Sequence, residues 1–139
     1  MAKEIIVDIR SVISTENGTE EISEKSKGSY IEKNGEIYIF CEENVEEAGI
    51  VKSRLKVSED FLELKKQGNS AAIMVFDTAK KTEAVYKTPF GNMNFIVDTK
   101  RYEKEISEKG ININLKYALL TDNNLVAEYD MDIKIEPTN

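Results

Sequence analysis

The sequence contains no histidine and no tryptophan, and it has a single cysteine, Cys41. Without histidine, the chain has no Ser–His or Cys–His nucleophile pair and no imidazole ligand for a metal. One thiol cannot form a disulfide within the chain, nor a thiolate zinc site. We therefore expect no metal site, no cofactor and no catalytic residues, so the expected protein is not an enzyme.

Long apolar runs are also absent. The N-terminal stretch MAKEIIVDIR alternates charged residues with short apolar pairs, which is typical of neither a signal peptide nor a membrane span. A single cysteine gives no indication of an oxidising compartment. We expect a cytoplasmic protein without membrane contact.

Basic residues are fewer than acidic ones, 19 against 26, and the net charge is −7. Such a surface repels a phosphate backbone unless a local basic patch overrides it. The candidates for a patch lie close together in sequence: Lys52, Arg54, Lys56, Lys65 and Lys66. Charges of this kind are typical of a solvated strand face. We expect no nucleic-acid partner, and the sequence does not indicate an oligomer.

A two-residue alternation of apolar and polar side chains dominates the chain, whereas helical periodicity is scarce. The pattern is sharpest in residues 111–119 and 127–135, where odd positions are mostly apolar and even positions mostly polar. It predicts strands with one wet face. No repeat or linker divides the chain, so residues 1–139 are predicted to form a single domain.

Two Asn-Gly dipeptides, at 17–18 and 34–35, are signals for two-residue hairpin turns. The first turn would pair Ile5 with Tyr30, and the second would pair Tyr30 with Ile39. Because side chains alternate between the faces of a sheet, both turns place the same set of residues on one inner face.

The stretch Thr88-Pro89-Phe90-Gly91 fits a type I turn, with proline at the second position and glycine at the fourth. A glycine bulge would close this turn and pair Val85 with Phe95 on the inner side. Near the C-terminus, Asp122-Asn123-Asn124 suits a three-residue loop that sets Tyr117 opposite Tyr129.

Further strands are predicted at about 49–57, 60–67 and 70–77, which brings the total to roughly eight to ten. So many strands joined by hairpins must close or leave long exposed edges. We therefore predict an all-β fold, a single up-and-down antiparallel β-barrel. A two-sheet sandwich is the alternative.

Residues 99–110 (TKRYEKEISEKG) contain strong helix formers and a terminal glycine. As a strand, the segment needs a change of parity, because Val97 is inward at an odd position whereas Tyr102 and Ile106 are even. A bulge near residues 98–101 would supply that change. A bulged strand and a helix both remain open, and we favour the strand.

Three polar residues, Ser11, Glu24 and Ser26, fall on the predicted inner face, with Ser11 facing Glu24. A carboxylate inside a barrel is costly unless it is paired or hydrated, so it is a sign of a wet cavity. The alternative is that the strand at 19–33 is bulged or extends past the rim of the barrel.

Four aromatic residues, Tyr30, Phe95, Tyr117 and Tyr129, share the same inner face. They would either line a ligand cavity or fill the core. Small barrels are large enough to be filled by side chains or to hold one small ligand. Together with the three polar residues they are the predicted ligand-binding set, in a cavity of about 300 Å³ or more.

Several stretches resemble the YwiB-like family of small bacterial proteins: Ser53-Arg54-Leu55-Lys56-Val57, Lys65-Lys66-Gln67-Gly68, Met74-Val75-Phe76, Tyr86-Lys87-Thr88-Pro89-Phe90-Gly91 and Thr99-Lys100. The turn Tyr86, Thr88, Pro89, Phe90 and Gly91 is the most specific of these. The chain departs from the family pattern at Lys66, where arginine is expected, and at Phe90, where tyrosine is common. The resemblance implies a calycin-like, lipocalin-type barrel and no activity.

Three functional hypotheses follow. The first is a barrel that binds a small, partly apolar ligand in its interior. The second is a protein-interaction module with a filled core, in which Phe90 meets the partner. The third is an enzyme, for which Glu24 is the candidate acid or base.

Overall fold

The computed structural model describes residues 3–45, 49–68 and 71–138, and these residues form ten strands. In chain order they are β1 (Lys3–Thr15), β2 (Gly18–Lys33), β3 (Glu36–Val45), β4 (Gly49–Val57), β5 (Phe61–Gln67), β6 (Ala71–Asp77), β7 (Thr82–Thr88), β8 (Gly91–Ser107), β9 (Gly110–Thr121) and β10 (Asn124–Pro137). Each strand pairs antiparallel with its sequence neighbour, and β1 also pairs with β10. The predicted all-β, up-and-down antiparallel barrel is confirmed, with ten strands. Within the described residues, no helix of membrane-spanning length and hydrophobicity occurs.

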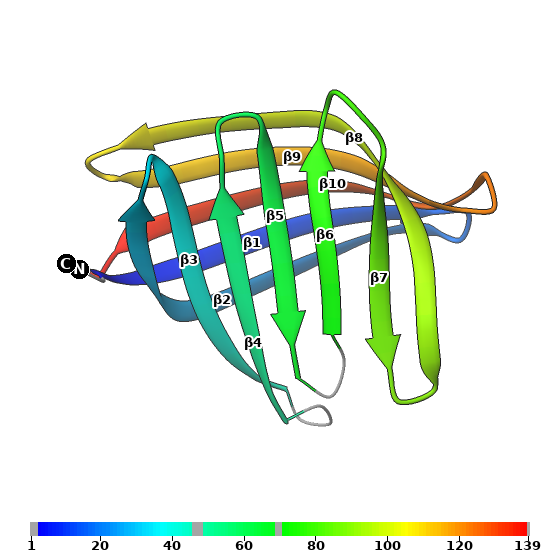
Figure 1. Ribbon diagram of the computed structural model, residues 1–139, viewed down its shortest axis with the longest axis horizontal. Helices are drawn as coiled ribbons and strands as arrows, with labels where there is room; N and C mark the ends of the chain where they lie inside the picture. The colour runs from blue at the N-terminus through cyan, green and yellow to red at the C-terminus, as the bar shows by residue number, and fades with distance from the viewer. Residues whose placement is uncertain (1–2, 46–48, 69–70, 139) are drawn as a thin grey trace.

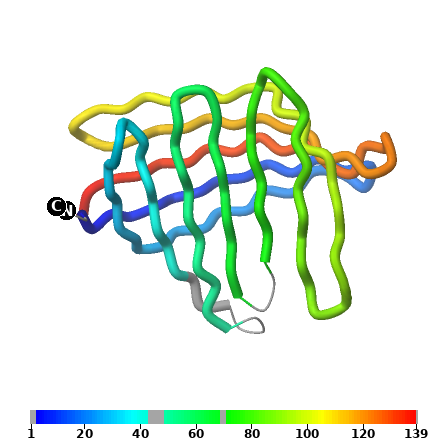
Figure 2. The backbone as a smooth tube through the Cα atoms, viewed as in Figure 1, coloured from blue at the N-terminus to red at the C-terminus, as the bar shows by residue number. Residues whose placement is uncertain are grey.

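The barrel is flattened into two layers (Figure 1). The long strands β1, β9 and β10 form one layer, and the shorter strands β3 to β7 run across them in the other (Figure 2). We call these the long-strand layer and the short-strand layer. Two strands belong to both: β2 pairs with β1 over residues 18–30 and with β3 over residues 28–33. Strand β8 likewise pairs with β7 over 91–97 and with β9 over 96–107.

The bends in β2 and β8 have local causes. Gly28 lies where β2 turns from one layer to the other, and a Cβ atom there would overlap the carbonyl oxygen of Phe40. In β8, the register with β9 shifts between Thr99 and Arg101, which is the predicted bulge. Residues 99–107 are therefore strand rather than helix, and Tyr102 turns to the inside of the barrel.

The hairpin at Asn34-Gly35 is confirmed. Both residues have positive φ, 54° and 80°, and Tyr30 pairs with Ile39 as predicted. At the other end of the chain, the Asp122-Asn123 turn has two residues rather than three. A bulge between Leu125 and Ala127 restores the register.

The register at Asn17-Gly18 is wrong by two residues. The turn consists of Glu16 and Asn17, so that Thr15 pairs with Gly18 and Ile5 pairs with Gly28 instead of Tyr30. An even shift leaves every side chain on its predicted face. The predicted opposition of Ser11 and Glu24 is wrong for the same reason: Ser11 lies opposite Ile22, and Glu24 opposite Ile9.

The register at the Pro89-Phe90 turn is wrong by one residue, and this does change the face. Thr88 pairs directly with Gly91, so Phe95 lies opposite Ala84 rather than Val85. Ala84 is fully buried, whereas Val85 lies opposite Asn94 on the outer side.

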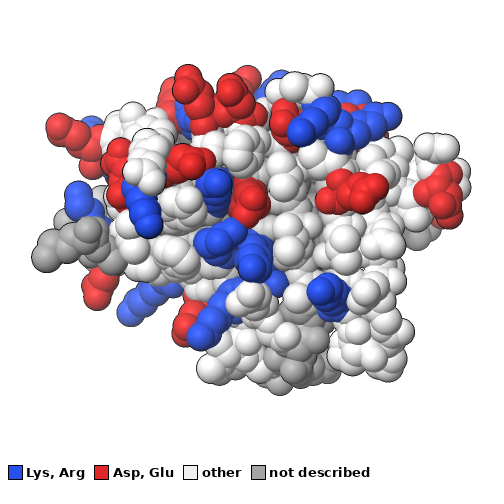
Figure 3. Space-filling model, in the orientation of Figure 1, with Lys and Arg blue, Asp and Glu red and all other residues white. Residues whose placement is uncertain are grey.

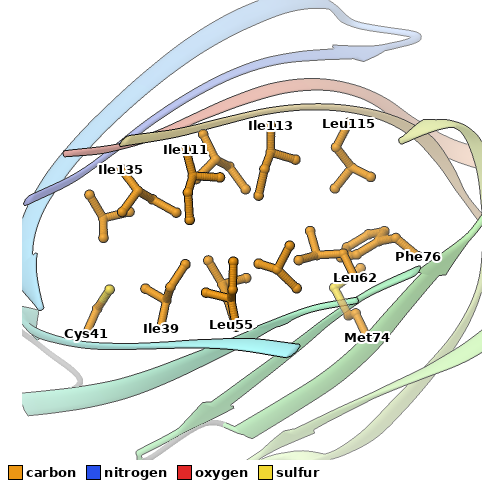
Figure 4. Packing of buried hydrophobic residues seen from close by; sticks show 14 of the residues in the cluster. Ile39, Cys41, Leu55, Leu62, Met74, Phe76, Ile111, Ile113, Leu115 and Ile135 are labelled. Atoms are coloured by element: carbon orange, nitrogen blue, oxygen red, sulfur yellow. The ribbon is translucent and has the colours of Figure 1, made fainter. Parts of the chain in front are cut away.

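Apolar side chains from both layers meet in one core (Figure 4). Ile39, Leu55 and Phe76 project from the short-strand layer toward Ile113 and Leu115 of the long-strand layer. All five are at most 5% exposed. The prediction of one shared inner face is therefore confirmed.

Candidate functional site

One inward-facing row of the short-strand layer is built mostly from small side chains. Across neighbouring strands, Gly28 pairs with Cys41, Cys41 with Ser53, Ser53 with Lys66, and Lys66 with Ala72. The next row toward the core carries larger residues: Ile39, Leu55, Leu64 and Met74. Four small side chains in one row leave space that the larger row does not.

Two of these small residues, Cys41 and Ser53, line a cavity of about 160 Å³ between the two layers. Its floor is apolar and comes from both layers: Leu62, Leu64, Phe76, Leu115, Met131 and Ile133. Its polar members are Ser11, Glu24, Ser26, Ser53 and Lys66. The exposed lining residues are Glu24 and Ile22, so the cavity has a hydrocarbon interior and a mouth with one charged and one apolar side chain. It is smaller than the predicted 300 Å³.

The polar side chains at the mouth come from both layers. Ser11, on β1, is buried, Ser26 is half-buried and Glu24 is exposed, both on β2. Lys66, near the end of β5, is half-buried. Residues 18–27 of β2 pair with β1 alone, because β3 joins β2 only from Gly28 onward. The mouth therefore lies between the unpaired edge of β2, the middle of β4 and the end of β5.

The structure brings the predicted polar residues together but places the predicted aromatic residues elsewhere. Tyr117 stacks on Tyr129 with ring centroids 4.6 Å apart, and Phe95 packs edge-on against Tyr86 at 5.2 Å. Tyr30 donates a hydrogen bond to Glu32 at 3.3 Å. None of the four predicted aromatic residues lines the cavity.

Burial keeps the inner phenols protonated. It raises the pKa of Tyr117, and the nearby phenols of Tyr129 and Tyr86 add to this rise. Burial also raises the pKa of Tyr102 to about 12, and the Tyr102 hydroxyl donates to the carbonyl oxygen of Ser58 at 2.7 Å. These tyrosines act as neutral core residues near pH 7.

Lys66 was not predicted as a cavity residue, because the Lys65-Lys66 pair suggested a solvated basic face. Lys65 lies opposite Ile73 and Arg54 on the outer side, whereas Lys66 lines the cavity. The sequence signal that could have identified Lys66 was the alternation along the strand: Leu62 and Leu64 point inward, so Lys66, two residues further on, does as well. The same parity argument applies to Ser53, two residues before the buried Leu55.

The residues of the Tyr86–Gly91 turn have different roles. Tyr86 points inward and its hydroxyl donates to the Met74 sulfur at 3.2 Å. Thr88 closes the turn: its hydroxyl donates to the Gly91 carbonyl oxygen at 2.8 Å and accepts from the Phe90 N–H at 3.2 Å. Phe90 itself is 99% exposed. Pro89 and Phe90 form the tip of the hairpin.

A larger hollow of about 820 Å³ lies on the outer surface of the long-strand layer. Charged side chains of both signs line it, among them Asp8, Arg10, Glu105 and Lys134. Apart from Ile113 and Ile133 its lining is polar or charged, so it offers a ligand less apolar surface to bury than the interior cavity does. The interior cavity is the better candidate site.

Comparison with known proteins places the chain in a family. A family model described as a domain of unknown function, DUF1934, matches residues 7–133. The chain belongs to the DUF1934 family. The uncharacterised β-barrel protein YwiB of Bacillus subtilis (strain 168) is 29% identical over 114 residues, which cover 81% of this chain and 79% of YwiB. A crystal structure of the ywiB protein from Bacillus subtilis matches with a TM-score of 0.89 at 25% identity, covering 99% of this chain and 94% of the other.

These findings confirm the predicted YwiB-like resemblance. The DUF1934 match, residues 7–133, includes every residue that lines the cavity, from Ile9 to Ile133. Membership in DUF1934 assigns no activity. The function is therefore inferred from the cavity.

Proposed function

We propose that this barrel binds a small, partly apolar molecule in its interior cavity and does not convert it chemically. The observation that carries the proposal is a cavity with an apolar floor, lined also by the small residues Cys41 and Ser53 and by polar side chains. An engineered apolar cavity of about 150 Å³ holds one benzene molecule. A cavity of about 160 Å³ therefore suits a body of roughly six to eight non-hydrogen atoms.

The composition of the mouth supports binding rather than catalysis. The titratable side chains that line the cavity are Glu24, Lys66 and Cys41, and the sequence has no histidine to serve as a base near neutral pH. We place this binding in the cytoplasm, on the ground that one cysteine gives no sign of adaptation to an oxidising compartment.

Filling the cavity is expected to abolish binding. Ser53→Leu would place four carbons in the small-residue row. The control is Ser23→Leu on the outer side of β2, where the side chain is exposed. Full-length protein with labelled Ile, Leu and Met methyl groups would be titrated with five-carbon alcohols, acids and amines. We expect the methyl signals of Leu62, Leu115 and Met131 to shift in the wild type and in Ser23→Leu, and not in Ser53→Leu.

Two results would contradict the proposal. One is the absence of any shift at these methyl groups with all three chemical classes. The other is an unchanged titration after Ser53→Leu in protein that remains folded by circular dichroism.

Protein recognition is the second candidate function, and the exposure of Phe90 favours it. A phenyl ring that is 99% exposed at a hairpin tip contributes nothing to the core, and Met93, three residues later in the chain, is 52% exposed. Exposed apolar side chains that lie close together mark interaction surfaces. We expect Phe90→Ala to weaken retention of a specific partner about tenfold in a quantitative pull-down from the protein's own host. A partner retained equally by both proteins would count against Phe90.

We infer that nucleic acid is not the partner. Figure 3 shows basic side chains gathered over the middle of the short-strand layer. Three of the basic residues there already pair with carboxylates: Lys52 with Glu42 at 3.9 Å, Arg54 with Glu63 at 2.5 Å, and Lys56 with Glu36 at 3.6 Å. Paired charges of this kind release few counterions on binding a phosphate backbone.

A further inference from the structure

The cavity lining carries one charge of each sign, on two strands that do not pair with each other. Glu24 is on β2, and Lys66 is on β5 beside Ser53. Both line the cavity. Among the described residues, neither of these two side chains forms an ion pair.

On the outer face of the neighbouring strand β4, Lys52, Arg54 and Lys56 each lie within 4.0 Å of a carboxylate oxygen. The outward basic residues of β4 thus have ion-pair partners, whereas among the described residues neither Lys66 nor the outward Lys65 of β5 has one within 4.0 Å. Because Lys66 and Glu24 both line the cavity without pairing with each other, a ligand there meets one cation and one anion.

We propose that the ligand is a small zwitterion with an apolar body, chemically an apolar α-amino acid. This inference rests on the proposed function of the cavity. The carboxylate of the ligand pairs with Lys66, and its ammonium group pairs with Glu24. The side chain of the ligand packs against Leu62, Phe76 and Leu115 in the cavity.

Serine hydroxyls complete the polar recognition. Ser11, Ser26 and Ser53 line the cavity, and a hydroxyl donates to a carboxylate as readily as it accepts from an ammonium group. The size of the cavity, about 160 Å³, suits a branched aliphatic side chain of four carbons.

A ligand with one charge fits this mouth less well. A carboxylate without an ammonium group would meet Lys66 but would also lie near the like charge of Glu24. An amine without a carboxylate would leave the half-buried Lys66 unpaired beside a second cation. A charge near apolar surface is costly unless an opposite charge or hydrogen bonds accompany it. The zwitterion is the head group that pairs both residues.

Four compounds with one isobutyl body test the head group directly. They are L-leucine, 4-methylpentanoate, 3-methylbutylamine and 3-methylbutan-1-ol. Dissociation constants come from titrations of the full chain, read at the methyl signals of Leu62 and Leu115. We expect leucine to bind at least about tenfold more tightly than any of the other three.

Two pairs of variants locate the charges. Lys66→Met keeps the length of the side chain, and its matched control is Lys65→Met on the outer face of the same strand. Glu24→Gln has Glu21→Gln, an exposed residue of β2, as its control. We expect Lys66→Met to weaken leucine about tenfold without weakening the amine, and Glu24→Gln to weaken both leucine and the amine. The two controls should change neither.

The outcomes separate this inference from the proposed function. If the alcohol or a singly charged compound binds as tightly as leucine, or if Lys66→Met leaves leucine binding unchanged in folded protein, the zwitterion is wrong and the cavity remains a binding site. If none of the four compounds shifts the cavity methyl groups, the proposed function fails as well.

Discussion

Replacing Phe76 by alanine is expected to lower the free energy of unfolding by about 3–5 kcal/mol. The Phe76 ring is 1% exposed, lies between the two layers, and is 4.6 Å from the ring of Tyr117. Removing it forfeits the contacts of a large apolar side chain and enlarges a cavity that already exists, because surrounding backbone in a closed sheet relaxes only partly. Urea unfolding followed by far-ultraviolet circular dichroism measures the change.

The chain offers a matched control in Phe90→Ala. The same atoms are deleted, but Phe90 is 99% exposed, so its removal should change the free energy of unfolding by less than about 0.5 kcal/mol. Equal effects of the two substitutions on the free energy of unfolding would mean that the Phe76 ring is not packed in the core in solution. A larger loss at Phe90 would point to packing of the hairpin tip against another surface.

The fold followed from the sequence because strand parity tolerates one kind of error. The predicted register of β1 with β2 was wrong by two residues, yet Ser11, Glu24 and Ser26 stayed on the inner face. An even shift moves a residue along the strand without turning it over. The odd error at the Pro89-Phe90 turn had the opposite effect and turned Val85 outward.

A different sequence signal explains the two faulty registers. In three hairpins, a hydroxyl residue precedes a glycine by three positions: Thr15 and Gly18, Thr88 and Gly91, Ser107 and Gly110. In each, the hydroxyl accepts from the backbone N–H two residues later and donates to the glycine carbonyl oxygen. The glycine has φ between +123° and +145°. The two residues between are the turn, so glycine closes the hairpin rather than forming its tip.

The candidate site was predictable only in part. Polar residues on an inner face can be identified from one strand at a time, and this led to Ser11, Glu24 and Ser26. A cavity cannot be identified from one strand at a time, because it depends on small residues aligned across several strands. The alignment of Cys41 with Ser53 becomes visible only once each register is known. The four inward aromatic residues were predicted as cavity residues, but in the structure they pack against the core.

Three glycine substitutions are expected to separate crowding from backbone strain. Gly28→Ala should lower the free energy of unfolding by about 3 kcal/mol, because the new methyl group would overlap the Phe40 carbonyl oxygen at the bend of β2. The φ of Gly28 is not positive, so crowding alone acts there. Neighbouring backbone must move for the methyl group to fit. The shift would reach Cys41, whose sulfur also borders the new methyl group.

Gly91→Ala isolates the other effect. Its φ is +128°, which side chains rarely adopt, and nothing lies within 4 Å of the added methyl group. The expected cost is about 1–2 kcal/mol. Gly110→Ala combines both effects, because its φ is +145° and the methyl group would overlap the Ile135 carbonyl oxygen. Its cost should exceed that of either other variant. If Gly28→Ala left the free energy of unfolding unchanged, the close approach of β2 and β3 would not be what requires glycine at the bend.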